Sequence, residues 1–485
     1  MLFATLAQAQ NLDNRNCGTV PTASYWEMID AIDTSLRWNY PNPENLKYVP
    51  LKIFAVANND GSGIVNNTRI LNMLCELNNR YDSTNIRFYM IEPPQPIFNS
   101  VYYSISDQTV ADQMMLGYNR NDVCNLYICD ISALGLCGYA YFPGTGPGPN
   151  SRAKGGIVLS TGCVEGTTLT HEMGHYLALP HPFDGTSGFP SSPGSELVTR
   201  NPNDTTNGRR RANCGTAGDR FCDTEADFIG NRWGCPYRGS QRDFNGDAYR
   251  PDGTLYMSYS SDACQNRFSN QQVSTMRYTL DNFRANFSVW PAPMNPKKGP
   301  MSSVGVYPPA GTVNIPRNFA RFRWTSTPNA SQYLLQISSS TAFTNPVFET
   351  VVNDSTYLYT GWRLTEGRTY FWRIRPFNPN DYCGIFSSYS DFVASRGYGI
   401  GIQETAEDAG WMVYPNPSSG GSLTVAFSGM GSKSLRVMNG MGAIVREMGI
   451  RAGQTEIVLD HFSSGVYFIE VIENGKVSRK KWLNL

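Results

Sequence analysis

The pattern of hydrophobic and polar positions changes near residue 290 of this 485-residue chain. Before that point, apolar runs such as LKIFAVA (51–57) alternate with stretches such as TRILNMLCELNNRY (68–81), where apolar residues recur at three- and four-residue steps. The apolar runs predict strands, and the three- and four-residue spacing predicts amphipathic helices. We therefore expect an α/β region over residues 47–289.

Beyond that point the pattern predicts β structure. The segment WPAPMNPKKGP (290–300) has too much proline for a helix or a central strand and indicates a linker. Residues 301–395 contain short alternating segments, among them FARFRW, QYLLQIS and TYFWRIRPF, separated by Gly, Pro, Asn and Asp. They predict a β-sandwich. A second joint at 396–410 precedes strand-like segments over 412–485. The expected fold is multidomain, with an α/β domain followed by two all-β, sandwich-like domains.

Composition limits the partners. The 40 basic and 40 acidic residues cancel, which leaves no global field to attract nucleic acid or an anionic membrane, and we expect no nucleic-acid partner. No stretch approaches the roughly 18–20 apolar residues that span a bilayer, so no transmembrane segment is predicted. The start, MLFATLAQAQ, has a short apolar run and a small-residue pattern but no basic residue. We interpret residues 1–9 as the remnant of an export signal.

Eleven cysteines are scattered along the chain without paired CxxC motifs. Such dispersal is typical of disulfides rather than of structural zinc knuckles. The sequence therefore favours an oxidising compartment.

Three of the four histidines lie in one short stretch, HEMGHYLALPH, which begins at His171. On a helix, His171 and His175 stand one turn apart on the same face and can reach one ion. Glu172 is offset by about 100° and can lie next to a metal-bound water without binding the metal. Pro180 cannot continue the helix, so a chain reversal there brings His181 back as a third nitrogen. Three imidazoles with one open position suit a catalytic zinc.

The alternative is that these histidines form ordinary hydrogen bonds in a core. The complete pattern, in a chain whose only other histidine is His461, favours the metal. The threonines of TTLT, directly before His171, are expected to supply the N-cap of the helix.

The same stretch matches the metzincin pattern HExxHxxGxxH at every defining position but one. With GYAYFP, GGIVLS, GDRFCDT and TLYMSYSSDAC around it, the region over about 48–288 resembles the pappalysin family of zinc endopeptidases. The resemblance implies a metzincin-like α/β domain in which His171, His175 and His181 bind zinc and Glu172 is general base and acid. The departure is Ala178, where the family has glycine for a left-handed turn, at a cost of about 1 kcal/mol.

The resemblance also implies roles for residues after the helix. Met257 is the methionine of the Met-turn, a hydrophobic floor beneath the metal. Tyr259 is expected near the metal, where its hydroxyl can hydrogen-bond an oxyanion; the alternative is a buried tyrosine that packs a turn. Cys235 and Cys264 match positions that are bridged in the family. Separately, Ser269 and Gln272 form a predicted capping box.

Specificity and calcium are less constrained by the sequence. By resemblance, Asp219, Asp223 or Thr224 of GDRFCDT binds calcium, the alternative being a turn whose carboxylates face water. Ala263, just before Cys264, brings no acidic group to a position where some relatives carry one. A preference for basic substrate residues therefore cannot be carried over.

Cys17, in RNCGT, resembles the cysteine of propeptides that block a zinc site with a thiolate. This interpretation makes residues 10–46 a propeptide and Cys17 a latency ligand to zinc; an ordinary disulfide is the alternative. Without Cys17 the catalytic region has nine cysteines, so at least one is free or pairs with Cys383.

The two C-terminal blocks carry resemblances of their own. Residues 301–395 resemble fibronectin type III-like modules, with Trp324 and YFWRIRPFN at inward strand positions. Residues 412–485, including GVYFIEV and a basic tail, are similar to the C-terminal sorting domain of the type IX secretion system. That similarity implies the secretion machinery as a partner, passage through the outer membrane, and a secreted or surface-attached product.

Two functions follow from the sequence. The first is a secreted zinc endopeptidase, made as a latent zymogen, which hydrolyses protein or peptide substrates. The second is a surface adhesion or glycan-binding protein with an inactive protease-like domain. Glu172 beside all three histidines favours the first, because a degenerate enzyme does not need its general base.

Overall fold

The computed structural model describes residues 16–40, 45–186, 189–203, 210–301, 305–361, 363–396, 410–418, 421–427, 431–440, 443–473 and 476–484. The expected export signal at 1–9 and nearly all of the joint at 396–410 lie outside the described residues. The chain forms two compact units. The first reaches to Met301 and includes 327–334 and 376–385, and the second comprises the remainder.

A seven-stranded sheet organises the first unit, in the order β1-β6-β7-β5-β2-β3, with β4 also paired to β2. All its strand pairs are parallel except β6 with β7. β2 is buried from Val49 onward, as expected for a central strand of a parallel sheet. The strands are β1 (Asn16–Cys17), β2 (Lys47–Ala57), β3 (Ile86–Met90), β4 (Gln95–Phe98), β5 (Cys124–Cys129), β6 (Leu136–Ala140) and β7 (Ile157–Ser160).

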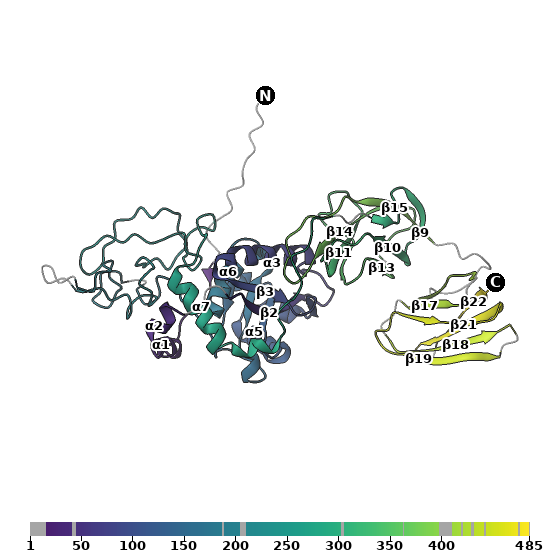
Figure 1. The fold of residues 1–485 in the computed structure, drawn as a ribbon, viewed down its shortest axis with the longest axis horizontal. Coiled ribbons are helices and arrows are strands. Elements are labelled where there is room, and N and C mark those ends of the chain that lie inside the picture. Colours follow the sequence, from purple (N-terminus) through teal and green to yellow (C-terminus); the bar gives the residue numbers. More distant parts are fainter. Residues whose placement is uncertain are drawn as a thin grey trace, which may run out of the picture. The chain divides into compact units, whose positions relative to one another are not determined.

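Helices cover both faces of this sheet, with α5 on one side and α3 and α6 on the other (Figure 1). Met114 and Met115 of α5 are buried in one cluster with Phe54 of β2. The predicted helix at 68–81 is confirmed as α3, which starts one residue earlier. The helices are α1 (Ala23–Asp30), α2 (Thr34–Trp38), α3 (Asn67–Tyr81), α4 (Ser100–Tyr103), α5 (Gln108–Tyr118), α6 (Thr168–Tyr176) and α7 (Asn270–Asn282).

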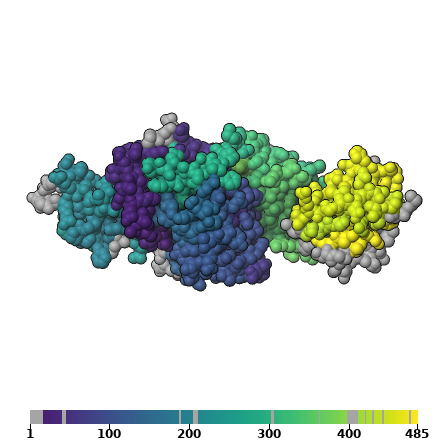
Figure 2. Space-filling view, turned by 90° about the horizontal axis from the view of Figure 1, so that it is seen from below, coloured from purple at the N-terminus to yellow at the C-terminus, as the bar shows by residue number. Residues whose placement is uncertain are grey.

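The N-terminal segment is built into the first unit. Strand β1 adds to the sheet beside β6, and α2 contacts α7. Figure 2 shows this purple segment at the surface beside the teal α7. Tyr25 is buried, packs its ring 4.0 Å from that of Phe142 and donates a hydrogen bond to the Ala178 carbonyl. Residues 16–40 therefore pack as part of the fold.

Between α6 and α7 the chain forms irregular loops tied by disulfides. Cys214 is bonded to Cys222, and Cys235 to Cys264, the pair that the family resemblance implied. Two further disulfides, Cys137–Cys163 and Cys75–Cys383, complete the four. Cys17, Cys124 and Cys129 are free. Helix α7 then begins with the predicted capping box of Ser269 and Gln272, which is confirmed.

The predicted linker at 290–300 is held by hydrogen bonds from the loop 376–385. Asn380 donates its side-chain amide to the carbonyls of Pro293 and Asn295, and Asn378 donates to that of Pro296. The same loop contains Cys383, which forms a disulfide with Cys75 on α3. A bond to Cys383 was one of the two outcomes expected for the odd number of cysteines in the catalytic region. The linker thus has neither helix nor strand but is fixed in place.

The second unit contains most residues of four further sheets, in which β15·β9 is parallel and β10·β13, β14·β15, β16·β17 and β18·β21 are antiparallel. Residues 305–395 form the sheets β13-β10-β8 and β12-β11-β14-β15-β9. Trp324 and Trp372 are buried, which confirms the predicted inward positions. The strands are β8 (Gly305–Tyr307), β9 (Thr312–Pro316), β10 (Ala320–Trp324), β11 (Gln332–Ser338), β12 (Phe348–Val352), β13 (Thr356–Tyr359), β14 (Thr369–Phe377) and β15 (Ser390–Ser395).

The last block, 410–484, packs two sheets around an apolar core. One has the order β16-β17-β20 and the other β19-β18-β21-β22. Val425, Val437, Ile469 and Trp482 are fully buried between them. Among the residues that the structure describes, no helix has the length and apolar character needed to cross a bilayer. The strands are β16 (Trp411–Tyr414), β17 (Leu423–Phe427), β18 (Lys433–Asn439), β19 (Ile444–Ile450), β20 (Glu456–Leu459), β21 (Gly465–Glu473) and β22 (Lys476–Asn484).

Candidate metal centre

The end of helix α6 brings the three histidines together. After Tyr176 the chain turns back at Ala178, whose φ of 73° is the left-handed conformation expected there. The Leu179 N–H bonds the Gly174 carbonyl and the Ala178 N–H bonds that of His175, the pattern of a Schellman motif. The reversal comes before Pro180 and carries His181 back to the helix.

The three imidazoles converge on one point. The Nε2 atoms of His171 and His175 are 3.1 Å apart, those of His175 and His181 3.1 Å, and those of His171 and His181 3.2 Å. A tetrahedral zinc with bonds of about 2.0–2.1 Å needs nitrogens about 3.3 Å apart. The histidine triangle therefore has the size of a zinc site.

Hydrogen bonds at the opposite ring nitrogens fix the orientation of each imidazole. Nδ1 of His171 lies 2.8 Å from the Tyr256 carbonyl, and Nδ1 of His175 lies 2.6 Å from the Leu179 carbonyl. Nδ1 of His181 lies 3.1 Å from a carboxylate oxygen of Asp184. Because these oxygens accept hydrogen bonds, Nδ1 of each ring carries the hydrogen, and the Nε2 lone pairs face the common centre.

Burial keeps the histidines in the form that binds a metal. His175 is fully buried and His171 nearly so. Burial, together with the neighbouring rings, lowers the pKa of His171 to about 3 and that of His175 well below its usual value. Both rings are therefore neutral at physiological pH, as metal coordination requires.

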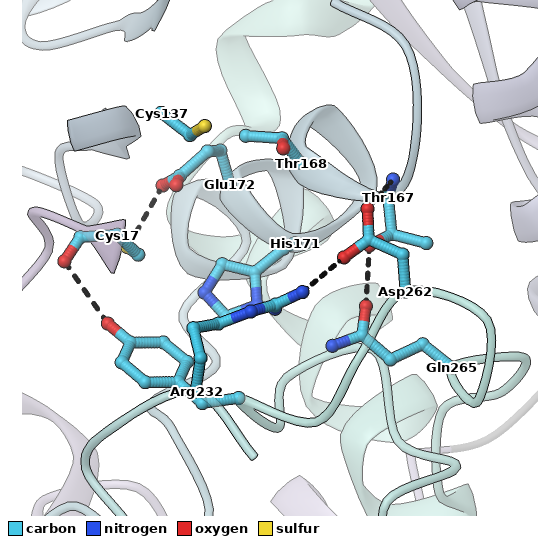
Figure 3. A pocket seen from close by; sticks show the side chains of 10 residues that line it. Cys17, Cys137, Thr167, Thr168, His171, Glu172, Arg232, Asp262 and Gln265 are labelled. Carbon is cyan, nitrogen blue, oxygen red and sulfur yellow. Dashed lines mark hydrogen bonds and ion pairs between the residues drawn. The ribbon is translucent and has the colours of Figure 1, made fainter. Parts of the chain in front are cut away.

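Glu172 is completely buried beside this triangle. Its Oε2 lies 3.4 Å from the Cys17 sulfur (Figure 3). The same oxygen lies 3.3 Å from the Thr19 hydroxyl. Burial raises the pKa of the Glu172 carboxyl to about 8. A Cβ at Gly138 would lie 2.9 Å from the Cγ of Glu172, so strand β6 needs a glycine here to let the side chain pass.

Met257 and Tyr259 lie on two sides of the histidines. Met257 is fully buried beneath α6, where a Cβ on Gly174 would lie 2.3 Å from its sulfur. Its sulfur is thus pressed against the helix backbone. The ring of Tyr259 is centred 4.8 Å from that of His181, and its hydroxyl donates to the Cys17 carbonyl.

Cys17 completes a four-residue cluster with the histidines. Its sulfur and the three ligand nitrogens all lie within 4.8 Å of one another. Thr19, two residues on, exchanges hydrogen bonds with the backbone of Ala140 on β6. The N-terminal segment therefore contacts the histidines, Glu172 and Tyr259 at once.

The structure contradicts one expectation and leaves the calcium site a prediction. Thr167 occupies the N-cap position of α6 but makes no capping bond, because its backbone is helical (φ −94°, ψ −2°) where an N-cap is usually extended; the threonine-cap prediction was wrong. Its hydroxyl donates to Gln265. The GDRFCDT residues also separate. The Thr224 hydroxyl donates to the Asp219 carboxylate, whereas Asp223 accepts from the Ser269 hydroxyl and the Gln271 N–H at the start of α7.

Sequence reasoning missed several residues of the site. Asp184 orients His181 from three positions away, a spacing that no pattern singles out. Thr19 reaches Glu172 across 153 residues. Arg232 and Asp262 form an ion pair in the hollow beside His171, and only the fold brings them there.

Two family models match the chain. Residues 105–281 match the peptidase family described as pregnancy-associated plasma protein-A, the pappalysins. The chain therefore contains a region similar to the peptidase domain of this family. Residues 412–484 match the secretion system C-terminal sorting domain. A peptidase domain joined to a sorting domain makes this a secreted or cell-surface protein.

Similar proteins include several fungal extracellular metalloproteases. One from Arthroderma benhamiae is 24% identical over 300 residues, 59% of this chain and 92% of that protein. One from Arthroderma otae is 27% identical over 227 residues, 43% of this chain and 75% of that protein. Among solved structures, mirolysin in complex with compound 9 is 21% identical, with a TM-score of 0.36, over 51% of this chain and 97% of that chain.

Proposed function

We propose that this protein is a secreted zinc endopeptidase that hydrolyses peptide bonds. The observation that carries the proposal is the triangle of Nε2 atoms, with sides of 3.1–3.2 Å, next to the buried carboxylate of Glu172. Zinc held by His171, His175 and His181 would supply a Lewis acid that activates water and polarises a peptide carbonyl. The alternative, an inactive adhesion protein, gains no support from this arrangement.

The side chains around the histidines have complementary roles in this proposal. Glu172 takes a proton from the attacking water and returns it to the leaving amine. Burial raises the pKa of Glu172 to about 8 because it disfavours the charged carboxylate. The carboxyl can therefore hold the proton until it passes to the leaving amine. Tyr259 donates its hydroxyl to the oxygen of the tetrahedral intermediate in place of the Cys17 carbonyl that it binds here.

We also propose that the N-terminal segment keeps the enzyme latent. The Cys17 sulfur lies at the histidine cluster, where a thiolate would take the open position on zinc. Thr19 and the Cys17 carbonyl meanwhile bond Glu172 and Tyr259. Cleavage near residue 46 would release the segment and free all three groups, which leaves 47–289 as the catalytic domain ahead of the modules at 301–395 and 412–485.

A structural calcium ion near Asp219 and Thr224 is a further part of the proposal. Asp219 is buried next to Glu196, and burial raises the pKa of both carboxyls. The Oε2 atom of Glu196 has no hydrogen-bond partner. Arg200 donates to the other carboxylate oxygen of Glu196 and compensates one of the two charges. The second buried acid is costly without a further cation, and oxygen ligands suit calcium. Calcium chelation is expected to lower the melting temperature of the full chain; an unchanged value would exclude the ion.

The experiment that tests the main proposal is a cleavage assay on casein or gelatin with the processed protein, where processing removes the N-terminal segment. Glu172→Ala and a zinc chelator are both expected to abolish cleavage, and added zinc is expected to restore it after chelation. Glu225→Ala, at an exposed acid of the same unit, is the matched control and should cleave like the unchanged protein. Equal and negligible cleavage in every sample would support the adhesion alternative.

A further inference from the structure

The hollow beside the metal centre contains one ion pair. A cavity of about 20 Å³, room for about one water, adjoins His171 and Glu172 and is lined on one side by Cys17, so that departure of the N-terminal segment would enlarge it. On the side away from Cys17 its walls carry Arg232, Asp262 and Gln265 (Figure 3). Because the hollow touches His171 and Glu172 directly, a side chain that fills it belongs to a residue flanking the scissile bond.

Arg232 and Asp262 are bonded to each other in this wall. A guanidinium nitrogen of Arg232 donates to the Asp262 carboxylate across 2.6 Å. The Arg232 side chain is 12% exposed and that of Asp262 24%, so both charges are largely withdrawn from water. Burial at this level makes each charge costly without the other.

The neighbouring polar groups in the wall are already engaged. Gln265 accepts from the Thr167 hydroxyl through Oε1 and donates through Nε2 to the carbonyls of Ser258 and Ser260. By contrast, Nε of Arg232 is buried without a hydrogen-bond partner. Recognition of charge in this hollow therefore depends on Arg232 and Asp262.

We propose that the Arg232–Asp262 pair sets the substrate class by cancelling charge, so that the hollow takes an uncharged side chain. This inference rests on the proposed peptidase function. A substrate lysine or arginine in the hollow is attracted by Asp262 but repelled by the guanidinium of Arg232. A substrate aspartate or glutamate is attracted by Arg232 but repelled by Asp262. Either loses its hydration without a net electrostatic gain. An uncharged side chain has no such loss.

The pair also predicts how the preference changes when it is broken. Arg232→Gln removes the cation beside the Asp262 carboxylate, which still accepts the Thr167 N–H across 3.4 Å, and a basic substrate residue can then supply a positive charge in its place. Asp262→Asn leaves the guanidinium free for an acidic residue. The double variant removes both charges and returns the preference to uncharged residues. No single structural defect produces opposite shifts in the two variants.

The test compares these variants in the processed protein, from which the N-terminal segment has been removed, with peptides that vary the two residues flanking one bond. The protein with the intact Arg232–Asp262 pair is expected to cleave peptides with uncharged flanking residues with a kcat/KM at least about tenfold higher than peptides with basic or acidic ones. Arg232→Gln should raise kcat/KM for lysine and arginine at one flanking position by about tenfold or more, and Asp262→Asn should do so for glutamate and aspartate. Arg69→Gln, which breaks the exposed pair with Glu165, should leave the profile unchanged.

Binding of the same peptides to zinc-loaded Glu172→Ala protein, by fluorescence anisotropy, separates the two proposals. One outcome is that the preferred substrate charge in binding reverses between the two single variants, while no chain with an intact Glu172 cleaves any peptide. That outcome would support the assignment of the pocket and overturn the proposed peptidase function. Cleavage with one profile in all variants would overturn the pocket assignment alone, as would a preference of the intact pair for charged residues. Thermal unfolding identifies any variant that does not fold, and the opposite single variant then decides.

Discussion

The metal centre and the last β block bury opposite kinds of side chain. Around α6 the buried groups are three imidazoles and the Glu172 carboxylate, with the half-buried Cys17 thiol beside them. In 410–484 the core is made of Val, Leu, Ile and aromatic rings, with Trp482 fully buried. Glu172 Oε1 has no hydrogen-bond partner, whereas no buried side-chain polar atom lacks one among the described residues of the last block.

The metal centre contains a buried polar atom without a partner, which lowers the stability of the fold there, and the described residues of the last block contain none. Burying unpaired polar groups costs free energy, and such groups persist where they bind or react. An apolar core has no such cost and supports only its own fold. We therefore expect substitutions at the metal centre to change activity, and substitutions in the last block to change stability.

The largest expected effect is at the histidines. His175→Ala removes one ligand nitrogen and opens a fully buried site, so the protein should lose stoichiometric zinc and at least about 100-fold in activity. His461→Ala, at the exposed fourth histidine, is the control. Metal analysis and casein cleavage measure the two quantities. Zinc retained by the His175→Ala protein would contradict the histidine triangle as the binding site.

In the last block, Trp482→Ala is expected to lower the free energy of unfolding by about 3–5 kcal/mol, because it leaves a cavity between the sheets. Its ring packs against those of Phe462 and Tyr467. Val477→Ala, at an exposed position of the same strand, should cost far less. Urea unfolding gives the free energies. Peptide cleavage by the processed Trp482→Ala protein should stay unchanged, and a matching loss of activity would show that the two regions are not independent.

A moderate effect is expected from the N-terminal segment. In the unprocessed chain, Cys17→Ala should raise cleavage by at least about tenfold, because tenfold corresponds to about 1.4 kcal/mol of lost inhibitory contact. Thr19→Val removes one hydrogen bond to Glu172 and should raise cleavage less, by roughly two- to tenfold. Cys129→Ala, at a free buried cysteine of the sheet, is the control. Equal activity of the Cys17→Ala and unchanged chains would refute latency by this residue.

The smallest effect is expected at the helix end. Ala178→Gly relieves about 1 kcal/mol of left-handed strain but removes a buried methyl group worth about 0.8 kcal/mol. The two terms nearly cancel, so the free energy of unfolding should change by less than about 0.5 kcal/mol. A change above 1 kcal/mol in either direction, measured by urea unfolding, would show that one of the two terms is wrong.

The features of the candidate metal centre that could be predicted from the sequence are those whose residues lie close together along the chain. The spacing of His171, His175 and His181 predicted their convergence, and Ala178 was expected in its left-handed turn. The capping box at Ser269 was equally local. Each depends on backbone geometry within about a dozen residues, which elementary helix and turn rules describe.

What the sequence did not show depends on long-range packing. Thr167 was expected to cap α6, but its backbone is helical there and its hydroxyl instead donates to Gln265, 98 residues away. Likewise, the ion pair of Arg232 and Asp262 exists only because the loop before α7 folds back on itself. Periodicity describes which face of an element is buried, and it carries no information on which distant polar group lies opposite.

The disulfide between Cys75 and Cys383 makes a covalent ring from most of the first unit and the region beyond its linker. A single cut anywhere between these two cysteines, whether by the enzyme on itself or by another protease, opens the ring but leaves both pieces joined. The peptidase would then stay attached to its sorting tail after nicking, and the nick would become visible only when the protein is reduced before electrophoresis.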